Sequence, residues 1–155
     1  MKIRALKPEE TKLLEEFLYL AIFVPEGVEA PPREIIQQPE LKLYYEAFGS
    51  GEADYCLAAE EEGQIVGMAW TRLMHDYGYV DDHTPSYAIA VLPQFRGRGI
   101  GTQLLAAMRN VLKENGWTRA SLAVQKQNRA VNLYQRAGFQ ILRETDDEYI
   151  MVQEL

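Results

Sequence analysis

The stretch QFRGRGIGTQLL, residues 94–105, places three glycines at alternate positions directly before an apolar, helix-like run. Arg96 and Arg98 lie between those glycines. Inside a regular element each glycine costs about 0.5–1 kcal/mol relative to alanine, so three of them indicate a special backbone shape. The helix that follows would leave about four N–H groups unpaired and carry a partial positive charge at its start. The stretch therefore predicts a loop that holds a diphosphate at a helix N-terminus.

Two common phosphate-binding patterns are absent from this stretch. The Walker pattern G-x-x-x-x-G-K-[ST] does not occur, and the dinucleotide pattern G-x-G-x-x-G would need glycine at Thr102 or at Leu104. The pattern [QR]-x-x-G-x-G does occur, as Arg96, Gly99 and Gly101, and an overlapping copy begins two residues earlier. We prefer the first frame because its last glycine falls at the expected start of the helix.

Outward from the glycines, the hydrophobic periodicity predicts seven strands and four helical segments. The expected strands are residues 2–6, 54–60, 64–73, 86–92, 120–124, 139–143 and 149–155, and the expected helical segments are 8–22, 35–44, 101–115 and 128–137. Hairpin turns require antiparallel neighbours, whereas the strand–helix–strand crossover after Ser86 requires one parallel pair. The predicted fold is a mixed sheet of the α/β (α+β) class, in a single domain over residues 1–155.

Composition restricts the classes of protein to which the chain can belong. Hydrophobic residues make up 47% and charged residues 25%, which is typical of globular proteins. No apolar run approaches the roughly 20 residues that span a bilayer, and the N-terminus MKIRALKPEE has no apolar signal core. Cys56 is the only cysteine, and we interpret it as a small buried residue rather than a nucleophile. We therefore expect a reduced, cytoplasmic setting without a membrane partner.

The net charge of −7 is unevenly distributed along the chain. Residues 94–143 hold nine of the 16 Lys and Arg residues but only one of the 23 acidic residues. A basic segment that contains a glycine loop suits an anionic ligand, and the acidic remainder of the chain could attract a cationic substrate. The alternative interpretation is that these are solvated helix faces, which often carry runs of like charge. The acidic remainder would repel a phosphate backbone, and no helix has a dense basic stripe, so no nucleic-acid partner is expected.

A second motif, NRAVNLYQRAGF at residues 128–139, follows the glycine stretch. Together the two motifs resemble the GNAT family of acetyl-CoA-dependent N-acetyltransferases, closely over residues 86–139 and upstream only in the order of elements. The resemblance implies a mostly antiparallel sheet with helices on both faces, and acetyl-CoA as co-substrate. The implied reaction moves an acetyl group directly to a primary amine of a small molecule or peptide, and a homodimer is a further expectation. His75 and His83 lack partners at zinc spacing, so no metal is expected.

The resemblance also implies roles for individual residues. The backbone of Ile89 and Val91 would pair with the pantetheine arm, and Asn128 would hold the region where two strands diverge. Tyr134 would lie near the thioester sulfur as a general acid. The alternative for Asn128 is a helix N-cap. The alternative for Tyr134 is simple packing in the core, and we prefer the catalytic role. The residues expected at the diphosphate are Arg96, Gly97, Arg98, Gly99, Ile100, Gly101 and Thr102.

The sequence departs from the family pattern at the position of the general base. Many family members carry a carboxylate on the strand before the glycine loop, but residues 86–92 contain no acid or base. Asp81, Asp82 and His83 are the nearest candidates, and an ordinary charged loop is the alternative interpretation. A non-catalytic acyl-CoA-binding or sensor module is the second function class, against which Tyr134 favours an enzyme. No motif identifies the acceptor amine.

Overall fold

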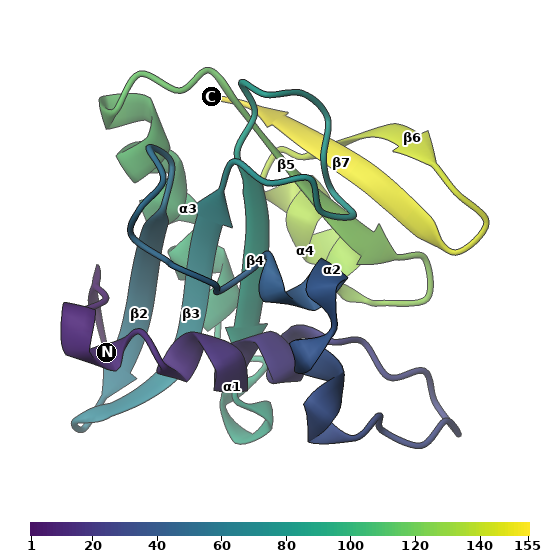
Figure 1. Cartoon of the computed structure of the whole chain (residues 1–155), viewed down its shortest axis with the longest axis horizontal. Helices are drawn as coiled ribbons and strands as arrows, with labels where there is room; N and C mark the ends of the chain where they lie inside the picture. Colours follow the sequence, from purple (N-terminus) through teal and green to yellow (C-terminus); the bar gives the residue numbers. More distant parts are fainter.

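The computed structural model describes residues 1–155 and contains one seven-stranded sheet (Figure 1). Its strands are β1 (Lys2–Ala5), β2 (Tyr55–Glu61), β3 (Gln64–Arg72), β4 (Ser86–Val91), β5 (Arg119–Gln125), β6 (Gln140–Glu144) and β7 (Glu148–Glu154). They lie in the order β1-β2-β3-β4-β5-β7-β6, and every neighbouring pair except β4 and β5 is antiparallel. The predicted mixed, mostly antiparallel sheet with one parallel pair is confirmed.

Helices cover both faces of this sheet (Figure 1). Helices α1 (Leu13–Ala21) and α2 (Pro39–Lys42) lie on one face, and α3 (Ile100–Glu114) and α4 (Ala130–Arg136) lie on the other. Successive side chains of a strand point to opposite faces, so Trp70 of β3 packs under α1 while its neighbour Ala69 packs under α3. The sheet therefore separates two hydrophobic cores. None of the helices combines the length and the apolar character needed to cross a membrane.

The segment between α1 and β2 contains little regular structure, as its prolines predict. A 3-10 turn, Arg33–Gln37, precedes α2, and Pro39 occupies the first turn of that helix, where its missing N–H is tolerated. The first helix differs from the prediction because Pro8–Glu10 form a separate 3-10 turn and α1 begins only at Leu13.

The two parallel strands β4 and β5 are paired only at their beginnings. The sheet register contains a single β4–β5 pair, Ser86 with Ser121, and the Ser121 N–H donates to the Pro85 carbonyl at 2.9 Å. Beyond this point the strands diverge and a gap opens between them (Figure 1). One edge of β4 is therefore left without a neighbouring strand.

Candidate functional site

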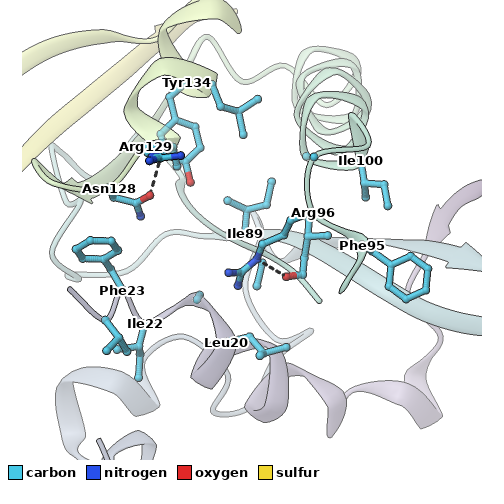
Figure 2. A pocket seen from close by; sticks show the side chains of 18 of the residues that line it. Leu20, Ile22, Phe23, Ile89, Phe95, Arg96, Ile100, Asn128, Arg129 and Tyr134 are labelled. Atoms are coloured by element: carbon cyan, nitrogen blue, oxygen red, sulfur yellow. Dashed lines mark hydrogen bonds between the residues drawn. The ribbon is translucent and has the colours of Figure 1, made fainter. Parts of the chain in front are cut away.

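A cavity of about 1400 Å³ lies beside the C-terminal half of β4 (Figure 2). Its walls are formed by residues 19–31, which comprise the end of α1 and the segment after it, by β4 with the glycine loop, and by α4 with the residues just before it. Pockets for single small ligands usually measure about 300–1,000 Å³. This cavity is large enough to take an extended ligand together with a second, smaller one.

The glycine loop forms one wall of the cavity. Gly97 and Gly99 have φ angles of +78° and +79°, a left-handed conformation that residues with a Cβ rarely adopt. A Cβ atom at either position would meet no other atom within 4 Å. Helix α3 begins at the next residue, Ile100, and no side chain caps its first N–H groups. Open space in front of free N–H groups at a helix N-terminus suits a phosphate.

The two arginines of the loop lie differently. Arg96 lines the cavity, and its Nε donates to the Val91 carbonyl at 3.0 Å (Figure 2). The Arg98 guanidinium instead lies 4.9 Å from the centre of the Phe95 ring, outside the cavity lining. The residues of the predicted diphosphate loop that line the cavity are Arg96, Gly97, Gly99, Ile100, Gly101 and Thr102. Of the predicted set, only Arg98 is held away from it.

The free edge of β4 forms a second wall. The Pro85 carbonyl bonds toward β5, while the Leu92 N–H donates to the Val66 carbonyl at 2.8 Å on the opposite side. Since successive residues of a strand direct their backbone groups to alternate edges, both bonds assign the backbone groups of Ile89 and Val91 to the open edge. The two predicted residues thus present backbone groups to the cavity.

Tyr134 of α4 has its ring in the core and its hydroxyl at the cavity. The ring packs edge-on against Phe139 with centroids 6.0 Å apart, and the residue is only 8% exposed. Figure 2 shows the hydroxyl pointing into the cavity, toward β4. Burial raises the pKa of Tyr134 because it disfavours the phenolate. The side chain therefore presents an O–H donor to the cavity at neutral pH.

Asn128 lies at the edge of the cavity and caps α4. Its Oδ1 accepts a hydrogen bond from the Ala130 N–H at 2.9 Å (Figure 2). This bond satisfies one of the unpaired donors at the start of the helix. The sequence left two roles open for Asn128, and the structure contains the hydrogen bond that the helix-cap role requires.

The wall opposite Tyr134 is residues 19–31, where Leu20, Ile22 and Phe23 face the cavity (Figure 2). The Tyr19 hydroxyl donates to the Pro31 carbonyl, and this bond joins the two ends of the segment. The residues of this wall that line the cavity are mostly apolar.

The expected base candidates do not line the cavity. Asp81 accepts hydrogen bonds from the Thr84 hydroxyl at 2.8 Å and from Arg119 at 2.7 Å. Hydrogen bonds from Thr84 and the His83 amide, together with Arg119, lower the pKa of Asp81. Asp82 and His83 are exposed on the same loop. The geometry agrees with an ordinary charged loop, the alternative interpretation.

Sequence reasoning did not single out Asp76 as a base candidate; it is a partly buried carboxylate at the point where β4 and β5 begin to diverge. Its two oxygens accept from the Ser86 hydroxyl and the Tyr44 hydroxyl, each at 2.8 Å. Burial raises the pKa of Asp76, although these hydrogen bonds oppose the shift. No local signal could identify it, because its partners lie 10 and 32 residues away in the sequence. Asp76 does not line the cavity.

The sequence matches known acetyltransferases. The profile of the Acetyltransferase (GNAT) family matches residues 20–139. A thialysine N-epsilon-acetyltransferase of Mus musculus is 42% identical over 121 residues, which cover 69% of this chain and 68% of that protein. A mycothiol acetyltransferase of Propionibacterium freudenreichii is 35% identical over 91 residues, 58% of this chain and 28% of that protein. The chain spans between about a quarter and two fifths of the length of the mycothiol acetyltransferases it matches.

Solved structures share the fold. The PaiA N-acetyltransferase from Thermoplasma acidophilum, in complex with coenzyme A, has a TM-score of 0.73 at 18% identity and covers 99% of this chain and 98% of its own. The yncA protein from Salmonella typhimurium, with acetyl-CoA, has a TM-score of 0.72 at 20% identity and covers 100% and 94%. At these identities the likeness concerns the fold alone.

Proposed function

The chain belongs to the GNAT family of acetyltransferases, and from this premise we propose that it moves an acetyl group from acetyl-CoA directly to a primary amine. The observation that carries the proposal is a single cavity that joins an open glycine loop at a helix N-terminus to the hydroxyl of Tyr134. A diphosphate fits the loop, and the thioester end of the same molecule would reach toward Tyr134.

The fit of acetyl-CoA rests mainly on backbone groups. The amides of residues 97–102 would hold the diphosphate, and the open edge of β4 at Ile89 and Val91 would pair with the pantetheine amides as a neighbouring strand does. Arg96 already bonds to the Val91 carbonyl. A carbonyl oxygen has two lone pairs, so that bond and one from the arm can coexist.

Tyr134 would stabilise the leaving sulfur. The neutral amine forms a bond to the thioester carbon, the carbon–sulfur bond breaks, and its electron pair stays on sulfur. The nitrogen releases one proton to water. Tyrosine titrates near 10 and a thiol near 8.5, and burial raises the pKa of Tyr134 further. A hydrogen bond to the developing thiolate is therefore favoured over complete proton transfer.

Amine-dependent release of free thiol tests the proposal. Purified protein is mixed with acetyl-CoA and a panel of primary amines, and the acetylated product is identified by mass. We expect thiol release that requires both the protein and an amine. Binding of CoA without turnover on any amine would instead indicate an acyl-CoA-binding module, the second function class.

The acceptor that we propose is a primary amine on a small molecule or peptide. The names of the relatives differ, since one contains thialysine and the other mycothiol, and the names alone do not select an acceptor. We propose that residues 1–155 act as one N-acetyltransferase domain in a reduced, cytoplasmic setting. The homodimer stays a prediction.

Cys56→Ala is expected to retain most of the turnover, because transfer is direct. Cys56 is buried and does not line the cavity, and burial raises the pKa of its thiol to about 12, so the nucleophilic thiolate is scarce. Turnover per folded molecule and the intact mass after acetyl-CoA treatment are measured. Lost turnover together with an acetyl group on Cys56 of the wild-type protein would show an acyl-enzyme instead.

A further inference from the structure

The cavity contains almost nothing that could take a proton from an ammonium group. A general base must lie within about 2.6–3.2 Å of the amine, or one water away. Among the 26 residues that line the cavity, the only carboxylate is Glu26, and there is no His, Asp, Lys or Cys. Glu26 is exposed on the segment that follows α1. An acceptor that enters as an ammonium ion meets no buried base there.

Bases elsewhere in the molecule are engaged in other contacts or do not line the cavity. Asp76 accepts a hydroxyl hydrogen bond at each oxygen, and Asp81 pairs with an arginine at 2.7 Å. His75 is stacked on a tyrosine with ring centroids 4.0 Å apart, and His83 is exposed. Glu148 of β7 is half-buried and also absent from the cavity lining.

The electrostatics of the cavity also disfavour an ammonium ion. Besides Arg96, which belongs to the proposed diphosphate loop, Arg129 and Arg136 line it against the single acid, Glu26. Fifteen of the 26 lining residues are hydrophobic, and the wall opposite Tyr134 is mostly apolar. Nearby cations and apolar surroundings both shift an amine toward its neutral form.

We infer that the acceptor is an amine already substantially neutral near pH 7, such as an α-amine, carried on an apolar body. The inference rests on the proposed acetyl transfer and narrows its substrate class. The amine enters as R–NH₂, its lone pair forms the bond to the thioester carbon, and the carbon–sulfur electron pair leaves with sulfur. The proton released from nitrogen passes to water, and no side chain has to remove a proton beforehand.

A pair of amines that differ in pKa tests the inference. The α-amine of the dipeptide Phe-Gly titrates near 7.8 and the side-chain amine of Nα-acetyl-lysine amide near 10.4, so about one in seven and one in 2,500 are neutral at pH 7. We expect kcat/KM at pH 7 to favour the α-amine by about 300-fold or more, falling to about 25-fold at pH 9 as the neutral fractions approach each other. For the side-chain amine, log kcat/KM should rise with a slope near one from pH 7 to pH 9.

Several outcomes separate this inference from the proposed function. The inference would be overturned if kcat/KM of the side-chain amine at pH 7 lay within tenfold of that of the α-amine. It would also be overturned if the pH profiles of kcat/KM for both amines showed the same pKa. Either result points to a base on the protein. The Glu26→Gln variant should keep the slope of one; loss of an acidic limb in that variant would identify Glu26 as a base. If CoA binds but neither amine, nor any in the wider panel, releases thiol, the proposed function fails and the inference fails with it.

Discussion

Tyr134→Phe is expected to lower the turnover number by about 100-fold or more, the usual contribution of a positioned acid. The substitution removes one hydroxyl and keeps the ring that packs against Phe139. The affinity for acetyl-CoA should change little, because the hydrogen bond strengthens mainly as charge develops on sulfur. Turnover, acetyl-CoA affinity and melting temperature are measured on the same preparation.

Tyr87→Phe provides a matched control for that experiment. Tyr87 also packs edge-on against Phe139, with centroids 5.7 Å apart, but its hydroxyl is buried without a hydrogen-bond partner and does not line the cavity. This variant should keep normal turnover, with stability unchanged or raised, because removal of an unpaired buried hydroxyl relieves a desolvation cost. Full activity in Tyr134→Phe, or an equal loss in both variants, would contradict the catalytic role of Tyr134.

The sequence predicts features that depend on local chemistry. Residue type and position relative to a strand or helix are enough to predict two of these features. They are the special backbone of the glycine loop and the placement of Tyr134 on helix α4. The parallel β4–β5 pair follows from the length of its crossover. These features form the glycine-loop wall, the β4 edge and the Tyr134 side of the cavity.

The remaining features depend on contacts between distant segments. Asp81 is close to β4 in sequence, yet its hydrogen bonds to Thr84 and Arg119 keep it within its own loop. Arg98 stacks on Phe95, and this contact competes with binding of a phosphate by the guanidinium. Counting charged residues in the sequence does not reveal such a contact. Beyond the end of α1, the apolar wall formed by residues 19–31 has no periodicity of its own, because it is irregular backbone positioned by packing and by the bond between Tyr19 and Pro31. The wall opposite Tyr134 was therefore the least predictable part of the cavity.

Gly99→Asn is expected to raise the dissociation constant for CoA by about tenfold or more, which corresponds to about 1.4 kcal/mol of binding free energy. The Cβ of the new residue projects into space that is open within 4 Å, where the phosphate would lie against the first N–H groups of α3. Asparagine is chosen because it tolerates the left-handed backbone better than other residues with a side chain. The effect on binding is thereby separated from the strain that a bulkier or branched residue would add.

Gly63→Asn is the control that decides how the Gly99→Asn result is interpreted. Gly63 lies in the turn between β2 and β3, has a φ of +82°, and has no atom within 4 Å of the position of a Cβ. The two substitutions therefore place the same side chain on nearly the same backbone conformation, but only Gly99 lines the cavity. Melting temperatures should show that both variants fold, while calorimetry should find weaker CoA binding in Gly99→Asn alone. Unchanged affinity in Gly99→Asn would exclude the glycine loop as the diphosphate site, and an equal loss in both would trace the effect to backbone strain.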